Sequence, residues 1–409
     1  MAENRARSTG LSLGTTGVSI AVVQHQAPDP PELIAFDHVS CRYLRDGMIV
    51  NLEALEDAVL QCRKNIQALV KSNFHSVTVN LCGFKLRHEH GRVTHAFKKR
   101  REIRKKDLSR VQQGQHLVAD DGWRLIHHYP ESYGLDAQQR LTSPVGMIGR
   151  ELSAEIQQVF APSEAIENLL HALRKCRLRP LHLVADPLGS LEALITPDER
   201  EIGICLLDIG GSVIQMASVI GSCIRIPSPL FVGGDLVTSD IAIGLNTTIK
   251  DAERIKIEHG CAISALASED RQIHIPPLGG GRADNPTSQQ RLAEIIQSRM
   301  EEIFEMTARH IKELELPEHY TSGIILTGAG SLLPGTAELA ETYLNMPVIE
   351  GHLRNLSGLT DIAPVPRAAS AVGLALYGLR HPQTLQWQSS RFLNLNSFTR
   401  NVFSWLGGE

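Results

Sequence analysis

The chain has 409 residues, of which 42% are hydrophobic and 21% charged, and its formal net charge is −4. This composition is typical of a globular protein large enough for two or more domains, and its charge gives no overall attraction to nucleic acid. The seven cysteines form no C-x-x-C pair, so we expect reduced thiols rather than a disulfide framework or a zinc site. No secretion signal is expected at the N-terminus, and no apolar run approaches the ~20 residues that span a bilayer.

The first pattern along the chain is a glycine turn between two apolar strands. Residues 1–9 are predicted to be a disordered tail, and residues 11–23 a β-hairpin whose turn contains Gly14, Thr15 and Thr16. The two threonine hydroxyls could hydrogen-bond a phosphate, although such turns are common. A strand over 33–40, a helix over 51–71 and a strand over 76–81 follow.

Residues 84–160 differ from the preceding segments in their residue pattern and are predicted to form a small inserted α+β domain. A basic run, Lys98–Lys106, could bind nucleic acid or anionic lipid. No aromatic residues interleave it and acidic residues flank it, which favours a solvated helix face. The pair His127 and His128 lacks matching ligands nearby and is predicted to be two ordinary strand residues.

The central stretch contains two more glycine pairs. A helix over 163–178 and a strand over 181–185 complete a β–α–β pattern, which favours an α/β fold. The strand over 204–207 then enters a turn with Asp208, Gly210 and Gly211, and a second β-rich run leaves it. Gly233, Gly234 and Asp235 follow and open a helix. Glycine lets backbone N–H groups approach an anion, and a helix N-terminus attracts one, so these turns predict a phosphate cradle.

The last third contains a further strand-to-glycine turn. A helix over 251–259 carries Glu253 and Lys256 on one face, either as a surface ion pair or as a pair reaching a ribose and base. A long helix runs from 288 to about 314, and the strand over 323–326 enters Gly328, Ala329 and Gly330. An Ala/Gly-rich helix over 367–379 is suited to close packing.

Taken together, these turns resemble the phosphate-1, phosphate-2 and adenosine elements of the actin/Hsp70/sugar-kinase superfamily. Within it, further stretches are similar to FtsA, the bacterial cell-division actin homologue, over nearly the whole chain. These stretches are Pro144–Met147, Val232–Asp235 with Asp240–Leu245, Ala252–Lys256 with Gly260–Ala262, and Ile295–Ile296 with Arg299–Ile303.

The resemblance implies an actin-like two-domain ATPase fold with duplicated RNase H-like halves. Domain 1A would comprise residues 10–83 and 161–200 with a helix over 366–379, and domain 1C residues 84–160. Domain 2A would comprise residues 201–247 and 311–365, and domain 2B residues 248–310.

The resemblance also implies the function: an ATP-binding, filament-forming adaptor on the cytoplasmic face of the inner membrane at the division site. Such proteins bind the FtsZ C-terminal tail and recruit other division proteins. Carried residue by residue, ATP would contact Gly14, Thr15, Thr16, Asp208, Gly210, Gly211, Gly233, Gly234, Asp235, Glu253, Lys256, Gly328, Ala329 and Gly330, with Asp208 toward Mg²⁺.

Two departures from the family pattern weaken the expected chemistry. Ser12 stands where the family usually has the aspartate of Asp-Ile-Gly-Thr, and a hydroxyl is a poor substitute for a carboxylate near Mg²⁺. The second phosphate loop continues as Ser212-Val213-Ile214-Gln215 where the family has Gly-Thr-Thr-Asp. We therefore expect weak or absent hydrolysis. A PilM-type pilus scaffold and a diverged superfamily kinase are the alternatives.

The C-terminal segment predicts a membrane anchor. Residues 380–390 are polar and aperiodic, a linker, and residues 391–409 predict an amphipathic helix that would lie in the headgroup layer of an anionic membrane. Its membrane-binding side chains would be Phe392, Phe398, Arg400, Val402, Phe403, Trp405 and Leu406. The alternative is a terminal helix that docks on the protein's own core.

Overall fold

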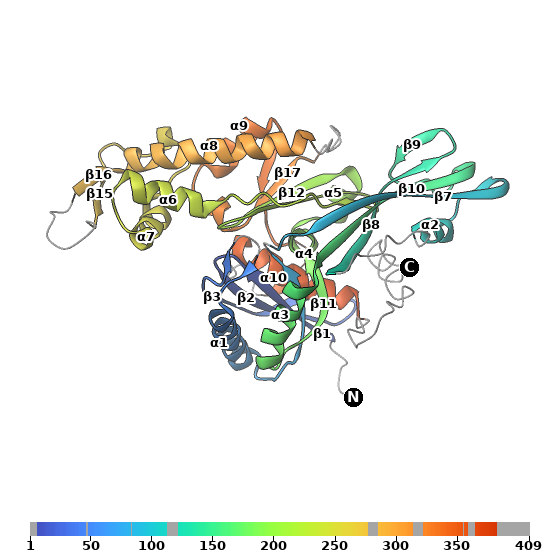
Figure 1. Ribbon diagram of the computed structural model, residues 1–409, viewed down its shortest axis with the longest axis horizontal. Helices are drawn as coiled ribbons and strands as arrows, with labels where there is room; N and C mark the ends of the chain where they lie inside the picture. The colour runs from blue at the N-terminus through green and yellow to red at the C-terminus, as the bar shows by residue number, and fades with distance from the viewer. Residues whose placement is uncertain are drawn as a thin grey trace.

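A computed structural model describes residues 6–45, 48–82, 84–112, 122–276, 285–313, 322–354, 356–358 and 365–382. A six-stranded sheet, a five-stranded sheet and a four-stranded sheet, with helices packed on them, make up most of the mixed α/β architecture, and β15–β16 and β4–β5 form two further two-stranded sheets (Figure 1). The predicted linker beyond residue 382 and the predicted C-terminal helix lie outside the described residues.

The first large sheet combines an antiparallel meander with parallel crossover strands. In spatial order its strands are β11 (Arg179–Ala185), β6 (Ser76–Leu81), β1 (Ala6–Gly14), β2 (Gly17–His25), β3 (Glu32–Ser40) and β19 (Ser357–Gly358). β1, β2 and β3 pair antiparallel, whereas β6 and β11 are parallel to β1 and to each other. Its helices and nearby short strands are α1 (Leu52–Val70), α3 (Ser163–Lys175), α4 (Asp186–Leu194), α10 (Val365–Arg380), β4 (Leu44–Arg45) and β5 (Met48–Ile49).

The second large sheet repeats that arrangement with five strands. In spatial order these are β14 (Cys223–Arg225), β13 (Ile214–Ile220), β12 (Ile204–Ile209), β17 (Ile324–Thr327) and β18 (Val348–Glu350). β12, β13 and β14 pair antiparallel, and β17 and β18 continue in parallel from β12. The two sheets are therefore duplicated halves, and each begins with a hairpin that carries a glycine turn.

Helices and short strands complete the second half. They are α5 (Pro197–Ile202), α6 (Gly234–Gly244), α7 (Ile249–His259), η1 (Ser264–Leu266), β15 (Gln272–Ile275), β16 (Asn285–Ser288), α8 (Gln289–Glu313), η2 (Ala329–Leu332) and α9 (Thr336–Leu344). Apolar side chains at helical spacing on α8, such as Leu292, Ile296 and Met300, pack against the second large sheet, as the sequence pattern predicts.

The inserted region between β6 and α3 forms its own antiparallel sheet. Its strands are β7 (Arg87–Glu102), β10 (Ile148–Pro162), β8 (Trp123–Leu135) and β9 (Gln138–Leu141), and α2 (Lys105–Gln112) packs beside it. The helix predicted for the basic run Lys98–Lys106 is wrong. Residues up to Glu102 continue strand β7, and α2 begins only at Lys105, because the long partner strand β10 extends the ladder that far.

The predicted disordered tail over residues 1–9 is also wrong where the structure describes it. Strand β1 begins at Ala6, because β2 is long enough to pair it back to His25. Thr9 is already buried. The polar sequence of this stretch does not predict a strand, because the strand is stabilised by backbone hydrogen bonds to β2.

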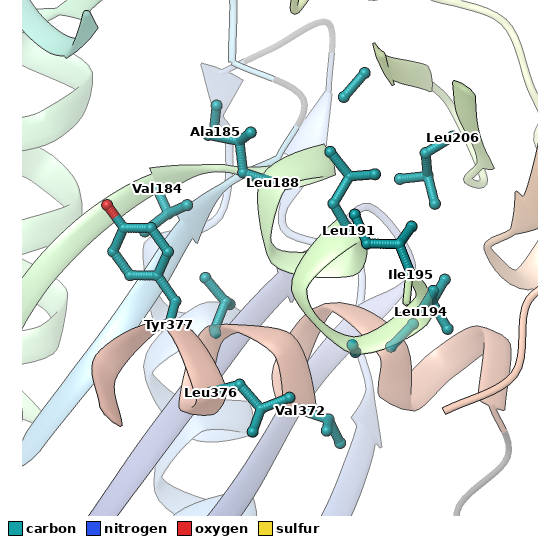
Figure 2. Close-up of a cluster of buried hydrophobic side chains, with 14 of the residues drawn as sticks. Val184, Ala185, Leu188, Leu191, Leu194, Ile195, Leu206, Val372, Leu376 and Tyr377 are labelled. Atoms are coloured by element: carbon teal, nitrogen blue, oxygen red, sulfur yellow. The ribbon is translucent and has the colours of Figure 1, made fainter. Parts of the chain in front are cut away.

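Helices α4 and α10 pack against each other at the centre of the molecule. Figure 2 shows apolar side chains of both helices, among them Leu188, Leu191, Val372 and Leu376, converging with strand residues such as Val184. Gly373 permits this contact, since a Cβ added there would overlap the backbone carbonyl oxygen of Gly189. The close packing predicted from the Ala/Gly-rich sequence of α10 is therefore confirmed.

Replacing Gly373 with alanine should be strongly destabilising, because the clash is between backbones and neither helix can yield alone. We expect a loss of about 3 kcal/mol or more in the free energy of unfolding, measured by urea denaturation. Gly91→Ala is the matched control, because a Cβ at Gly91 meets nothing within 4 Å. Equal stability of the two variants would contradict the packing argument.

Candidate functional site

The glycine turns of the two halves meet directly. The hydroxyl of Thr15, in the turn between β1 and β2, accepts hydrogen bonds from the backbone N–H of Gly211 at 3.2 Å and of Ser212 at 3.3 Å, in the turn between β12 and β13. Thr15 is buried by this contact. Because the two halves share one strand arrangement, their first hairpins end at corresponding places, and the duplicated fold brings the turns face to face.

Helix α6 begins on the second of these turns. The N–H of Gly234 donates to the carbonyl oxygen of Gly210 at 3.1 Å, and the N–H of Asp235 donates to that of Gly211 at 2.7 Å. A Cβ at Gly233 would lie 2.6 Å from both carbonyl oxygens, so only glycine fits there. The predicted glycine pairs therefore form one structure, with a helix N-terminus held against a hairpin turn.

Helix α7 supplies a buried lysine beside the start of α6. The Nζ atom of Lys256 lies 2.8 Å from Oε2 of Glu253, and donates to the carbonyl oxygen of Gly234 at 3.0 Å and to Oγ1 of Thr238 at 2.7 Å. Burial opposes ionisation of Glu253, but hydrogen bonds from Lys256 and Thr238 keep its pKa below the usual value. The predicted pair on one helix face is thus an ion pair that joins α7 to α6.

The third glycine turn packs on the end of β12. Gly328 has a φ of +86°, a conformation that favours glycine, and a Cβ on Gly330 would lie 3.0 Å from the carbonyl oxygen of Ile209. Ala329 begins η2 between them. The structure therefore gathers residues from all four predicted stretches into one region between the halves. These stretches are Gly14–Thr16, Asp208–Gly211, Gly233–Asp235 with Glu253 and Lys256, and Gly328–Gly330.

Sequence reasoning missed Asp186, which lies at the base of this region. Its carboxylate accepts hydrogen bonds from Nδ2 of Asn80, from Nε2 of Gln215 at 2.9 Å and from Oγ of Ser370 at 2.6 Å. A signal was present: Asp186 follows β11 in the first half, and Asp208 lies near the end of β12 in the second. Carboxyl ends of strands in related sheets gather at one edge, where sites form.

Arg42 was also missed, although it links the two halves. Its Nη2 atom lies 3.0 Å from Oδ1 of Asp235, and this hydrogen bond, more than the opposing desolvation, raises the pKa of the guanidinium. Arg42 follows strand β3 of the first half, whereas Asp235 opens helix α6 of the second. No pattern around Arg42 distinguishes it from an ordinary loop arginine.

The donor atoms here fit Mg²⁺ poorly. Desolvation by the surrounding turns and the charge of Asp186 raise the pKa of Asp208 to about 8, and burial raises the pKa of Asp186 itself. The oxygens of Asp186 already receive protein donors, and Ser12 and Gln215 are neutral. Mg²⁺ prefers ionised carboxylates and water. Across the described ranges no cluster of three or more potential metal-ligating side chains occurs.

What the arrangement offers is anion binding. The N–H groups of Gly211 and Ser212 point at the hydroxyl oxygen of Thr15, and a phosphate oxygen that displaced this hydroxyl could accept the same two hydrogen bonds. The dipole of α6 adds partial positive charge nearby, although its first two N–H groups are hydrogen-bonded to Gly210 and Gly211 and its first turn carries Asp235. The chemistry available is therefore binding and orientation of an anion between the halves.

Comparison with known proteins assigns the family. Two family models match: "Cell division protein FtsA" over residues 205–373 and "SHS2 domain inserted in FTSA" over residues 83–160. The chain is 32% identical to the cell division protein FtsA of Pseudomonas aeruginosa over 374 residues, covering 91% of this chain and 89% of that protein. The chain belongs to the FtsA family. It is also 28% identical to FtsA of Escherichia coli K12 over 421 residues, covering 100% of this chain and 99% of that one.

Solved structures support the actin-like fold of this FtsA-family chain. The PilM–PilN type IV pilus biogenesis complex contains a chain that matches with a TM-score of 0.63 at 19% identity, covering 91% of this chain and 98% of that one. MreB5 of Spiroplasma citri bound to ADP matches with a TM-score of 0.54 at 13% identity, covering 91% and 95%. The predicted fold class and the predicted family are both confirmed, and family membership favours a cell-division protein over the pilus scaffold and the kinase.

The raised pKa of Asp208, which forms a buried carboxyl pair with Asp186, predicts how the stability of the protein depends on pH. The pKa of Asp208 lies above its usual value of 3.8, so the folded protein retains a proton that the unfolded chain releases. Stability should therefore fall as pH rises from about 4 to about 8. Asp208→Asn should flatten this dependence and increase the free energy of unfolding at pH 8 by about 1 kcal/mol or more.

Urea denaturation at pH 5 and pH 8 measures this effect. Asp29→Asn is the control, because Asp29 is exposed and far from the carboxyl pair in the sequence. An unchanged pH dependence in Asp208→Asn would show that Asp208 is ionised in the folded protein.

Proposed function

We propose that this FtsA-family protein is an ATP-binding adaptor that links the FtsZ C-terminal tail to the inner membrane at the division site. The observation that carries the nucleotide part is the meeting of both hairpin turns with the N-terminus of α6, around Thr15, Gly211 and Gly234. The family assignment carries the division role. Recruitment of other division proteins belongs to the same proposal.

In the proposed complex, ATP lies between the halves. Gly14, Thr15 and Thr16 would contact phosphate from one side, and Asp208, Gly210 and Gly211 from the other. Gly233, Gly234 and Asp235 would lie near sugar and phosphate, Glu253 and Lys256 near ribose and adenine, with Gly328, Ala329 and Gly330 behind them. ATP must displace the Thr15 hydroxyl from the amides of Gly211 and Ser212, which lowers its net affinity.

Mg²⁺ would add little to this complex. Asp208 is the residue we assign to it, but the oxygens of Asp186 already accept protein hydrogen bonds, and Ser12 and Gln215 supply no charge. Bound nucleotide would thus stabilise the structure of the protein, and its hydrolysis would be slow or absent. A superfamily kinase, in contrast, requires carboxylates for metal and catalysis.

The membrane part rests on the sequence. Residues 391–409 would form the amphipathic helix, with aromatic side chains in the headgroup layer and Arg400 near anionic phosphate. No described helix is long and apolar enough to cross a bilayer. The domain division given above, with residues 84–160 taking part in self-association into filaments, is part of the same proposal.

Calorimetry tests the nucleotide proposal. We expect ATP to bind, with an affinity that changes by less than about threefold when Mg²⁺ is removed, and turnover slower than the roughly 1 s⁻¹ typical of slow metabolic enzymes. No heat of binding at millimolar ATP would refute the nucleotide site. Rapid Mg²⁺-dependent turnover would refute the structural role.

Vesicle recruitment tests the adaptor proposal. A labelled FtsZ tail peptide should sediment with anionic vesicles only when the protein is present. Trp405→Glu should reduce this recruitment roughly tenfold, because a large apolar side chain in the membrane is replaced by a charge. Peptide binding in solution should be unchanged and is the control. A peptide that fails to bind in solution would instead favour the pilus scaffold.

A further inference from the structure

One end of the inserted sheet concentrates the positive charge of the chain. Residues 98–110 contain eight lysines and arginines against Glu102 and Asp107, a net charge of +6, while the rest of the chain carries −10. This segment is called the basic end below, together with the adjacent residues 142–150, which comprise the loop before β10 and the first three residues of β10. It lies where β7 runs out toward α2 (Figure 1).

A bulge in β7 pushes the basic side chains outward. Ala96 pairs with Glu151 and Arg101 pairs with Gly149, so residues 97–100 face the single residue Arg150. Extra residues of this kind leave the ladder and bend the strand. Lys98, Lys99 and Arg100 are exposed there, as are Lys105 and Lys106 at the start of α2.

The acidic groups near the basic end neutralise only part of its charge. Asp107 is paired with Arg101, and Asp136 lies 3.6 Å from Arg100. Within the described ranges, Lys98, Lys99, Lys105 and Lys106 have no ion pair. Protection of an edge strand against pairing would explain a lysine or two in β7. It does not explain the lysines that continue into α2.

Two large apolar side chains are exposed in the middle of this charge. Ile148 is 64% exposed and Val145 is 39% exposed. Val145 lies in the loop before β10, and Ile148 begins β10, where it pairs with Glu102. Two backbone hydrogen bonds, both 2.9 Å, join this loop to the basic segment, from the N–H of Ile103 to the carbonyl oxygen of Met147 and from the N–H of Gly146 to that of Ile103. The backbone that carries Val145 and Ile148 is therefore held against residues 102 and 103, in the middle of the basic segment.

We propose that the basic end is a contact site for membranes that carry anionic phospholipids. Lysines and arginines bind phosphate headgroups, while exposed apolar side chains between them enter the interfacial layer. A soluble polyanion such as a nucleic acid would use the charge but would leave Val145 and Ile148 without a role. This contact adds to the proposed membrane function and does not require the C-terminal helix to bind.

Vesicle co-sedimentation of the full chain tests the proposal. The variant Lys98→Gln/Lys99→Gln/Lys105→Gln should bind vesicles with anionic phosphatidylglycerol roughly tenfold more weakly than wild type, and the deficit should shrink in high salt. Val145→Ser/Ile148→Ser should weaken binding about threefold or more, with less dependence on salt. The charge-matched control, Lys64→Gln/Lys250→Gln/Lys312→Gln, removes three exposed lysines elsewhere and should bind like wild type.

The same substitutions in a Trp405→Glu background separate this contact from the C-terminal helix. A lysine effect that persists there supports the basic end, whatever Trp405→Glu does alone. The proposal is overturned if the lysine variant binds anionic vesicles like the control, or if its deficit is as large on purely zwitterionic vesicles. It is also overturned if the variant loses sedimentation without vesicles to the same extent, because the basic end would then be a contact between copies.

Discussion

One buried carboxyl group, that of Asp186, is a point on which much of the structure depends. Donors from β6, β13 and α10 converge on it through Asn80, Gln215 and Ser370, so strands of both halves and the central helix meet at one place. A carboxyl group this deeply buried is costly unless each oxygen is hydrogen-bonded. The hydrogen bond from Gln215 therefore ties the second half to the first near the turns around Thr15 and Gly211.

The sequence predicted well those elements whose local residue pattern favours the same secondary structure that the tertiary contacts stabilise. Strand–glycine–strand turns and the amphipathic α8 were foreseen because short-range chemistry specifies them. The start of β1 and the helix expected over Lys98–Lys106 were wrong, because the pairing partners, β2 and β10, lie elsewhere in the chain. Long-range hydrogen bonds override the local character of a polar segment.

The candidate site shows the same division. Its glycines were predictable because close backbone approach, as at Gly233, tolerates nothing larger. The sequence predicted that the hydroxyl of Thr15 donates a hydrogen bond to a phosphate. In the structure this hydroxyl accepts hydrogen bonds from the opposite turn. Arg42 and Asp186 were missed because each acts only through a partner from a distant part of the chain. The replacement of a family aspartate by Gln215 was noticed as a loss, yet its amide makes a bond to Asp186 that an ionised aspartate could not.

The position of α10 has a mechanical consequence. The helix packs along β1 and β2 and against α4, and its last residue, Arg380, is paired with the buried Glu192, while His381 contacts the ring of Tyr377 and accepts a bond from His182 through its carbonyl oxygen. A load applied to the chain after residue 382 would thus enter the protein as shear along a core helix. It would have to break many contacts at once instead of peeling an edge. The contacts of Arg380 with Glu192 and of His381 with His182 would transmit such a load to α4 and β11.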